Sequence, residues 1–94
     1  MKETLERIIN KFGEDAQIEM MIEECSELIQ ALQKYKRAKS NHAGEIVMIE
    51  KRMTEVEEEI ADVKIMMEQA SIIFRREIID YNISYKLQRI QSKL

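Results

Sequence analysis

The sequence has no proline, no tryptophan and only two glycines, at positions 13 and 44, in 94 residues. Proline and glycine are the residues that most strongly interrupt helices, so their scarcity excludes a chain that turns often. The residues that are abundant instead, among them Glu, Lys, Ile, Met and Leu, favour helix formation. The composition therefore predicts an all-α fold.

Only one cysteine, Cys25, is present, which excludes a disulfide within the chain. The sequence also lacks an apolar run of about 18 residues and a recognisable secretory leader. Positive charge is not in excess, because 15 Lys and Arg stand against 18 Asp and Glu, and this balance argues against general binding to nucleic-acid phosphates. We therefore expect a reduced, cytoplasmic protein that binds neither membrane nor nucleic acid.

The chain is small, at 11.2 kDa, and its 45% hydrophobic and 35% charged residues are typical of one soluble globular domain, here residues 1–94. A domain of this size buries only roughly 60 to 65% of the surface that its unfolded chain exposes. A lone monomer would have a narrow margin of stability, and association with further copies would widen it. We therefore expect a homo-oligomer.

Few positions carry the signals that end a helix. Gly13 is expected to end a short first helix, and the stretch from Ser40 to Gly44 is the internal cluster of turn-forming residues. Phe74 closes a long periodic segment, and Asp80 is expected to cap the last helix. These signals predict four helices, over residues 2–12, 15–39, 45–74 and 79–93.

The second predicted helix presents apolar residues over more than half of its circumference between positions 18 and 35. Within this arc only Glu24 and Glu27 are charged, whereas Glu23 falls on the opposite, solvated side. One neighbouring helix cannot cover so wide an arc, so a second subunit is expected to pack there. The apolar members are Ile18, Met20, Met21, Ile22, Cys25, Leu28, Ile29, Ala31, Leu32 and Tyr35.

The third predicted helix also combines an apolar stripe with an acidic margin. Glu55, Glu59 and Asp62 are spaced at i, i+4 and i+7 and therefore share a face. Acids at this spacing also arise by chance in a chain with 18 acidic residues, so the spacing alone is weak evidence. The apolar stripe comprises Ile49, Met53, Val56, Ile60, Val63, Met67, Ala70 and Phe74.

A long antiparallel hairpin of the second and third helices would bring the acids together. Centred on Ala43, the hairpin places Glu24 opposite Asp62, and the same register places Glu27 opposite Glu59. Four carboxylates beside an apolar layer repel one another, so a positive partner is required. A hard divalent cation, Mg²⁺ or Mn²⁺, suits carboxylate oxygens best. A salt-bridge network with Lys or Arg and a plain solvated margin are the alternatives.

Basic residues gather near the ends of two predicted helices. On the last helix, a cationic ridge containing Lys86 and Arg89 lies opposite an expected core stripe of Ile83, Leu87 and Ile90. Such a ridge either offsets the helix dipole at a solvated surface or binds phosphates beside a metal. Dipole compensation alone explains the tract at the end of the second helix, which comprises Lys34, Lys36, Arg37 and Lys39.

Short motifs in these segments resemble those of a known enzyme family. Residues 23–28 read E-E-C-S-E-L and residues 59–63 read E-I-A-D-V. They resemble the E-E-x-x-E-L and E-x-x-D-V motifs of MazG-like nucleoside triphosphate pyrophosphohydrolases. Residues 86–89, K-L-Q-R, are similar to the basic K-L-x-R segment in the fourth helix of that family. Together with residues 13–17, the resemblance covers nearly the whole chain.

The resemblance implies an all-α, Mg²⁺-dependent enzyme that cleaves a nucleoside or deoxynucleoside triphosphate to the monophosphate and pyrophosphate, with Mn²⁺ as an alternative ion. It also implies a homodimer, or a homotetramer built as a dimer of dimers. The implied residues are Glu24, Glu27, Glu59 and Asp62 for metal binding and catalysis, Lys86 and Arg89 for phosphate binding, and Glu23 and Glu55 as accessory groups.

Two features depart from the family pattern. Glu27 and Glu59 are separated by 31 residues, so the hairpin is longer than in many members, and the fuller basic motif R-x-H-P of some relatives is missing. The preferred base and sugar therefore stay open. Two other functions also stay open: a non-catalytic helical-bundle protein for oligomerisation or interaction, and a metal-dependent nucleotide binder without turnover.

Overall fold

The computed structural model describes residues 1–41 and 45–94. Within these ranges the chain forms four helices and no strand, which confirms the all-α prediction. None of these described helices is both long enough and apolar enough to cross a bilayer. The helices are α1 (Lys2–Phe12), α2 (Glu14–Asn41), α3 (Ile46–Ile73) and α4 (Arg76–Gln91).

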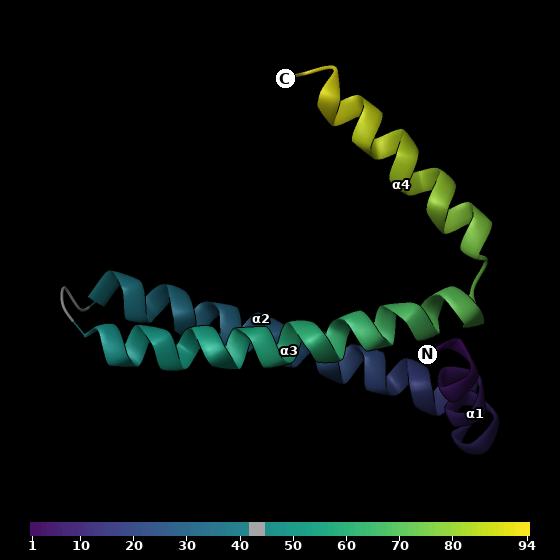
Figure 1. Cartoon of the computed structure of the whole chain (residues 1–94), viewed down its shortest axis with the longest axis horizontal. Coiled ribbons are helices and arrows are strands. Elements are labelled where there is room, and N and C mark those ends of the chain that lie inside the picture. The colour runs from purple at the N-terminus through teal and green to yellow at the C-terminus, as the bar shows by residue number, and fades with distance from the viewer. Residues whose placement is uncertain (42–44) are drawn as a thin grey trace.

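The two longest helices, α2 and α3, lie side by side and run in opposite directions (Figure 1). This confirms the predicted packing of the second helix on the third, although the predicted centre at Ala43 lies outside the described residues. One series of buried and half-buried positions on each helix recurs every three or four residues, as in helices that cross at a shallow angle. We call this series the seam. It comprises Gln17, Met21, Glu24, Leu28, Ala31, Tyr35 and Ala38 on α2 and Ile49, Arg52, Val56, Glu59, Val63, Met66, Ala70 and Ile73 on α3.

The seam corrects the apolar stripe predicted for α3. Met53, Ile60 and Met67 belong to the predicted stripe, yet each is at least 40% exposed and lies one residue after a seam position. The predicted and observed series share every second member, because both satisfy the same spacing of three and four residues. The difference matters for chemistry, since it places Glu59 within the seam rather than on its margin.

The first helix ends at Gly13, as the sequence predicts. Gly13 has φ 93° and ψ 154°, its N–H donates to the carbonyl of Ile9 at 2.8 Å, and its own carbonyl accepts the N–H of Gln17 at 3.2 Å. Only glycine adopts this backbone conformation without strain. The resulting bend packs α1 against both α2 and α3 and buries Leu5 (Figure 1).

The last helix begins at Arg76 instead of near residue 79, and Asp80 lies inside it, so the prediction that Asp80 caps this helix is wrong. Arg75 holds the cap position in an extended conformation, and its carbonyl accepts the first hydrogen bonds of the helix at 3.1 Å. Because the backbone alone starts the helix, no capping side chain marks the position in the sequence. The preceding helix ends before Phe74, in agreement with the prediction.

The fourth helix leaves the hairpin and contacts α3 alone (Figure 1). Within the described chain none of its residues is buried, and Ile83, Leu87 and Ile90 are each more than half exposed. The prediction that these three residues form a core stripe is therefore wrong for a single chain. In this arrangement no described part of the chain covers the stripe.

Replacing Gly13 with alanine is expected to lower the free energy of unfolding by roughly 1 to 3 kcal/mol, because an L residue is strained at this backbone conformation. Apart from Gly13 and its two chain neighbours, no described residue has an atom within 4 Å of the position that the added Cβ would take, so the backbone conformation causes the effect. Urea unfolding followed by circular dichroism measures it. The control Asn10→Ala, at an exposed site of α1, should leave stability unchanged or slightly higher. Equal stability of Gly13→Ala and the unchanged chain would contradict the prediction.

Candidate metal centre

Three carboxylates meet where α2 and α3 pack together. Carboxylate oxygens of Glu24, Glu27 and Glu59 all lie within 4.8 Å of one another. The first two share one face of α2 at a spacing of three residues, and the third comes from the facing side of α3. We call these three residues the acidic cluster. Their convergence depends on the antiparallel register of two segments that are distant in the sequence.

Asp62, the fourth acid predicted at this level, lies next to the acidic cluster and not inside it. Its side chain is exposed, and it is one residue before a seam position of α3. Its negative charge nevertheless contributes to raising the pKa of both Glu24 and Glu59. Asp62 is therefore close enough to act on the acidic cluster electrostatically.

Two oxygens of the acidic cluster are buried without a partner. Glu24 Oε2 and Glu59 Oε2 are shielded from solvent, and neither is hydrogen-bonded to any described residue. A buried polar atom without a hydrogen bond destabilises the folded state, and a carboxylate oxygen does so more than a neutral group. The described residues therefore offer these two oxygens no donor, although a hydrogen bond between the Glu27 and Glu59 carboxyl groups is among the causes that raise the pKa of Glu59.

Burial and neighbouring negative charges raise the pKa of two members of the acidic cluster. Burial raises the pKa of Glu24 most, followed by the negative charge of Glu27 and then that of Asp62. Burial also raises the pKa of Glu59, and the charge of Glu27 adds to the effect. Both shifts mean that the protein disfavours the ionised carboxylates in the absence of a cation.

The acidic cluster fits a hard divalent cation. Mg²⁺ binds oxygens at about 2.0 to 2.1 Å in near-octahedral geometry, so neighbouring ligand oxygens lie about 3 Å apart and opposite ones about 4 Å apart. The upper limit of 4.8 Å between the cluster oxygens is within a small side-chain adjustment of these separations. Carboxylate oxygens are the donors that Mg²⁺ and Mn²⁺ prefer, and the two buried oxygens lack any other partner among the described residues. Glu24, Glu27 and Glu59 are thus suited to hold the ion.

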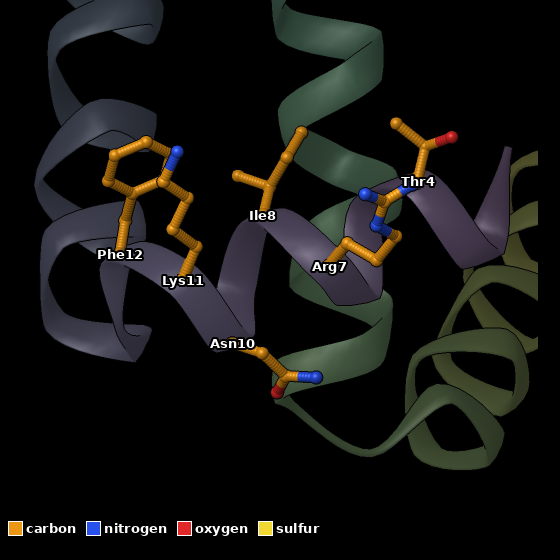
Figure 2. A pocket seen from close by; sticks show the side chains of 6 residues that line it. All are labelled: Thr4, Arg7, Ile8, Asn10, Lys11 and Phe12. Carbon is orange, nitrogen blue, oxygen red and sulfur yellow. The ribbon is translucent and has the colours of Figure 1, made fainter.

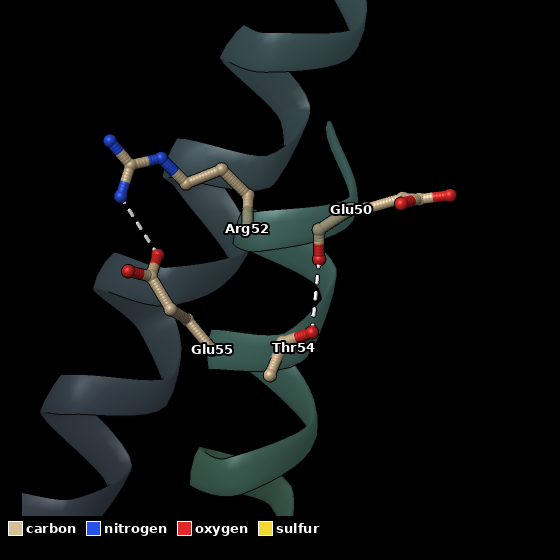
Figure 3. A network of polar contacts seen from close by, with 4 residues as sticks. All are labelled: Glu50, Arg52, Thr54 and Glu55. Atoms are coloured by element: carbon tan, nitrogen blue, oxygen red, sulfur yellow. Dashed lines mark hydrogen bonds and ion pairs between the residues drawn. The ribbon is translucent and has the colours of Figure 1, made fainter. Parts of the chain in front are cut away.

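The ion pairs found among the described residues do not neutralise the acidic cluster. Arg52 is a seam residue, but its guanidinium binds Glu55 on the same helix at 2.8 Å (Figure 3). This hydrogen bond lowers the pKa of Glu55. Glu55, which the resemblance suggests as an accessory group, is therefore paired with Arg52 and not with the acidic cluster. The other pair joins Arg76 to Glu68 at 3.3 Å, near the end of α3. The alternative of a salt-bridge network therefore lacks support in the described contacts.

An open hollow of about 330 Å³ lies over one side of the acidic cluster. Lys34 lines it, although the helix dipole alone explains this residue at the sequence level. Lys34 follows Glu27 by seven residues, which is two turns along the same face of α2. This spacing is the sequence signal that places Lys34 on the same side as Glu27. The lining residues are Glu27, Gln30, Ala31, Lys34, Glu55, Glu58 and Glu59.

The residues predicted to bind phosphate lie elsewhere. Lys86 and Arg89 are exposed on α4, where they line a separate shallow hollow of about 240 Å³ with Ile90 and Lys93. The structure does not bring them to the acidic cluster within one chain, because α4 points away from the hairpin (Figure 1). Glu23, the other accessory candidate, is exposed on α2, and its charge makes a small contribution to the raised pKa of Glu24.

A larger hollow of about 580 Å³ lies over α1 (Figure 2). No carboxylate is among the side chains that line it, and Lys11 Nζ lies 5.3 Å from the centre of the Phe12 ring. Its walls come from a single short helix, so it offers no converging set of catalytic groups. The lining residues are Thr4, Arg7, Ile8, Asn10, Lys11 and Phe12.

In comparisons with known proteins, no protein-family model, no curated protein and no solved structure matches the chain. The acidic cluster is therefore interpreted from its own geometry and from the short motifs of the sequence.

Replacing Glu59 with glutamine is expected to stabilise the metal-free chain, and to do so more at neutral pH than at pH 4.5. Since the pKa of Glu59 in the folded chain lies above its ordinary value of 4.5, the folded state is favoured below pH 4.5 and loses that contribution as the pH rises through the raised pKa. Glutamine carries no charge at either pH and avoids this loss. Urea unfolding in the presence of a chelator, at both pH values, measures the difference.

The matched control is Glu57→Gln, at an exposed position two residues away on α3. This change is expected to leave the pH dependence of stability close to that of the unchanged chain. An equal effect of Glu57→Gln and Glu59→Gln at both pH values would show that the burial of Glu59 is energetically unimportant.

Proposed function

We propose that this chain is a Mg²⁺-dependent nucleotide pyrophosphohydrolase that converts a nucleoside or deoxynucleoside triphosphate to the monophosphate and pyrophosphate. The observation that carries the proposal is the convergence of Glu24, Glu27 and Glu59, two of which bury an oxygen without a partner among the described residues. The motif resemblance to MazG-like enzymes supports it independently of the coordinates, since it involves these same three acids together with Asp62.

The residues of the site have distinct roles in this proposal. Glu24, Glu27 and Glu59 hold the metal, and Asp62 adds negative charge beside it. A Mg²⁺ ion bound there supplies neutralisation of the phosphate oxygens and activation of water. The oxygen of a water molecule attacks the α-phosphorus, the bond from that phosphorus to the bridging oxygen breaks, and pyrophosphate leaves. A carboxylate of the site orients the water and accepts its proton.

Phosphate groups also need cations from the protein. Lys34 is the basic side chain among the described residues that line the hollow over the acidic cluster. Lys86 and Arg89 remain candidates by the motif resemblance, but on this arrangement they would reach a substrate only from a second copy or after movement of α4. The proposed enzyme acts as a homo-oligomer, which would make the first route available.

The principal test is release of pyrophosphate from a panel of ribo- and deoxyribonucleoside triphosphates in Mg²⁺. Glu59→Gln is expected to lower kcat/KM by about 100-fold or more, because it removes a charged metal ligand while the fold is kept. Glu57→Gln, at its exposed position, should retain the activity of the unchanged chain. Intact substrates throughout the panel, or equal rates for Glu59→Gln and the unchanged chain, would refute the proposal, and the best substrate would define the base and sugar.

The main competitor is a non-catalytic helical-bundle interaction protein, which the large exposed apolar side chains favour. Thermal unfolding with and without Mg²⁺ separates the two, because a ligand at about 100 times its dissociation constant stabilises the native state by roughly 2.7 kcal/mol. An interaction protein would show no Mg²⁺ effect. A nucleotide binder without turnover would show the stabilisation but release no pyrophosphate.

Replacing Lys34 with glutamine is expected to lower kcat/KM by about 10- to 100-fold, because a charge-assisted hydrogen bond to phosphate would be lost. Lys36→Gln is the matched control, since Lys36 is an exposed lysine two residues away that does not line the hollow. Kinetics of pyrophosphate release measure both variants. Equal losses in the two would assign the effect to general surface charge and remove Lys34 from the site.

A further inference from the structure

Gln69, near the end of α3, is fully buried and its amide has no partner. Its exposed fraction is 0%, and neither Oε1 nor Nε2 is hydrogen-bonded to any described residue. Gln17 faces it in the antiparallel register and is also buried, but no hydrogen bond joins the two amides in the described part of the chain. A buried amide without hydrogen bonds destabilises a fold relative to an apolar side chain of similar size. Packing alone therefore does not explain a glutamine at this position.

Gln69 lies on the same side of the hairpin as the acidic cluster. Residues one position before the seam, such as Glu27 and Glu58, line the hollow there, and we call this side the acidic side. Gln69 comes one position before the seam residue Ala70. It follows Asp62 by seven residues, which is two turns along the same face of α3. The acidic side therefore continues from the cluster to Gln69, toward the end of the hairpin where α1 packs (Figure 1).

Two apolar side chains lie on the acidic side between the cluster and Gln69. Met20 on α2 and Ile65 on α3 each come one position before a seam residue, and the register places them almost opposite each other. They are 40% and 43% exposed. A planar ring that covers them would remove apolar surface from water, and the flexible thioether of Met20 adapts its shape to such a ring. Carboxylates, apolar side chains and an amide thus follow one another along one side of the hairpin.

The spacing of these groups matches the length of a nucleotide. Gln69 follows Glu59 by ten residues, or about 15 Å along the helix axis. Side chains of a helix lean toward its N-terminus, so the Gln69 amide is directed back toward Glu59. An extended nucleotide spans roughly 10 Å from its α-phosphorus to the outer edge of its base, judged from ordinary covalent bond lengths. A base therefore reaches the level of this amide when the phosphates lie at the acidic cluster.

The amide of Gln69 matches the edge of a nucleobase. It presents one acceptor and one donor side by side, and nucleobases carry a donor and an acceptor next to each other on their edges. A metal ion would satisfy only Oε1, and a phosphate oxygen would satisfy only Nε2. Since Gln69 is fully buried, the base reaches it only when neighbouring side chains shift, and the rotatable bonds of Met20 allow such a shift.

We infer that the chain binds its nucleotide along the acidic side, with the base against Met20 and Ile65 and the edge of the base hydrogen-bonded to the Gln69 amide. The inference rests on the proposed function for the position of the phosphates at the acidic cluster. Gln69 is a specificity residue here and takes no part in the chemistry at phosphorus. It selects nucleotides over phosphate compounds that lack a base, because only a base supplies partners for both amide atoms.

The test is calorimetric titration of the full chain in Mg²⁺ with two kinds of ligand. The first is a set of α,β-methylene nucleoside triphosphates, which lack the P–O bond that hydrolysis would break, and the second is inorganic tripolyphosphate. Gln69→Leu is expected to weaken nucleotide binding by about 10- to 100-fold and to leave tripolyphosphate binding unchanged, because two hydrogen bonds to the base are lost. Gln33→Leu, at an exposed site of α2 that does not line the hollow, should change neither affinity.

Unfolding without any ligand gives a second measurement on the same variant. Gln69→Leu is expected to raise the urea midpoint, because leucine removes two unpaired buried atoms. A glutamine retained for structure alone would instead make this variant less stable. Unchanged nucleotide affinity, an equal loss for nucleotide and tripolyphosphate, or a lower urea midpoint would each overturn the inference.

A second pair of variants tests the apolar part of the site at exposed positions that the fold tolerates. Ile65→Ala is expected to weaken nucleotide binding about 5-fold through lost apolar contact, again without an effect on tripolyphosphate. The matched control is Ile60→Ala, which is almost equally exposed, at 40%, but follows the seam residue Glu59 and lies on the other side. Equal effects of the two changes would contradict the placement of the base.

The binding assay needs no turnover, so the two proposals can fail separately. Gln69-dependent nucleotide binding without release of pyrophosphate would refute the hydrolase and support the base site. Release of pyrophosphate from nucleotides, with the same kcat/KM for Gln69→Leu as for the unchanged chain, would support the hydrolase and refute the base site.

Discussion

The placement of two carboxylates in the packing seam between α2 and α3 is the constraint on which the rest of the structure depends. Most seam positions hold side chains that gain free energy when they leave water, whereas Glu24 and Glu59 lose it. The apolar seam residues at both ends of the hairpin must compensate for this loss. A bound cation would convert the same two positions from a destabilising to a stabilising part of the seam.

Residues one position before the seam and residues one position after it differ in chemical character. One step back leads to charged groups around a hollow, including Glu27 and Lys34. One step forward leads to exposed Ile, Leu and Met side chains, with the charged Glu57 and Lys64 between those of α3. The proposed metal chemistry would therefore use one side of this pair of helices and leave the other side free.

Several features of the fold could be predicted because a local signal carries them. Gly13 ends a helix through its own backbone freedom, and the acids converge because the two arms of the hairpin have a regular period. The choice between two apolar series on α3 could not be predicted, since Ile60 looks more suitable for burial than Glu59 until the facing helix is known. The course of α4 escaped prediction because Arg75 starts the helix by backbone hydrogen bonds alone. The position of Lys34 in the hollow depended on tertiary contacts.

The alternation of acidic side, seam and apolar side also limits how such a chain can change in length. Insertion of one residue into either long helix would rotate everything beyond it by about 100°, which would move uncharged side chains into the hollow and acids onto the opposite side. Insertion of about seven residues restores the rotation, but it shifts the arm by two turns and must be matched in the other arm to keep Glu24 beside Glu59. Evolution of this hairpin should therefore proceed by paired additions or losses of whole heptads.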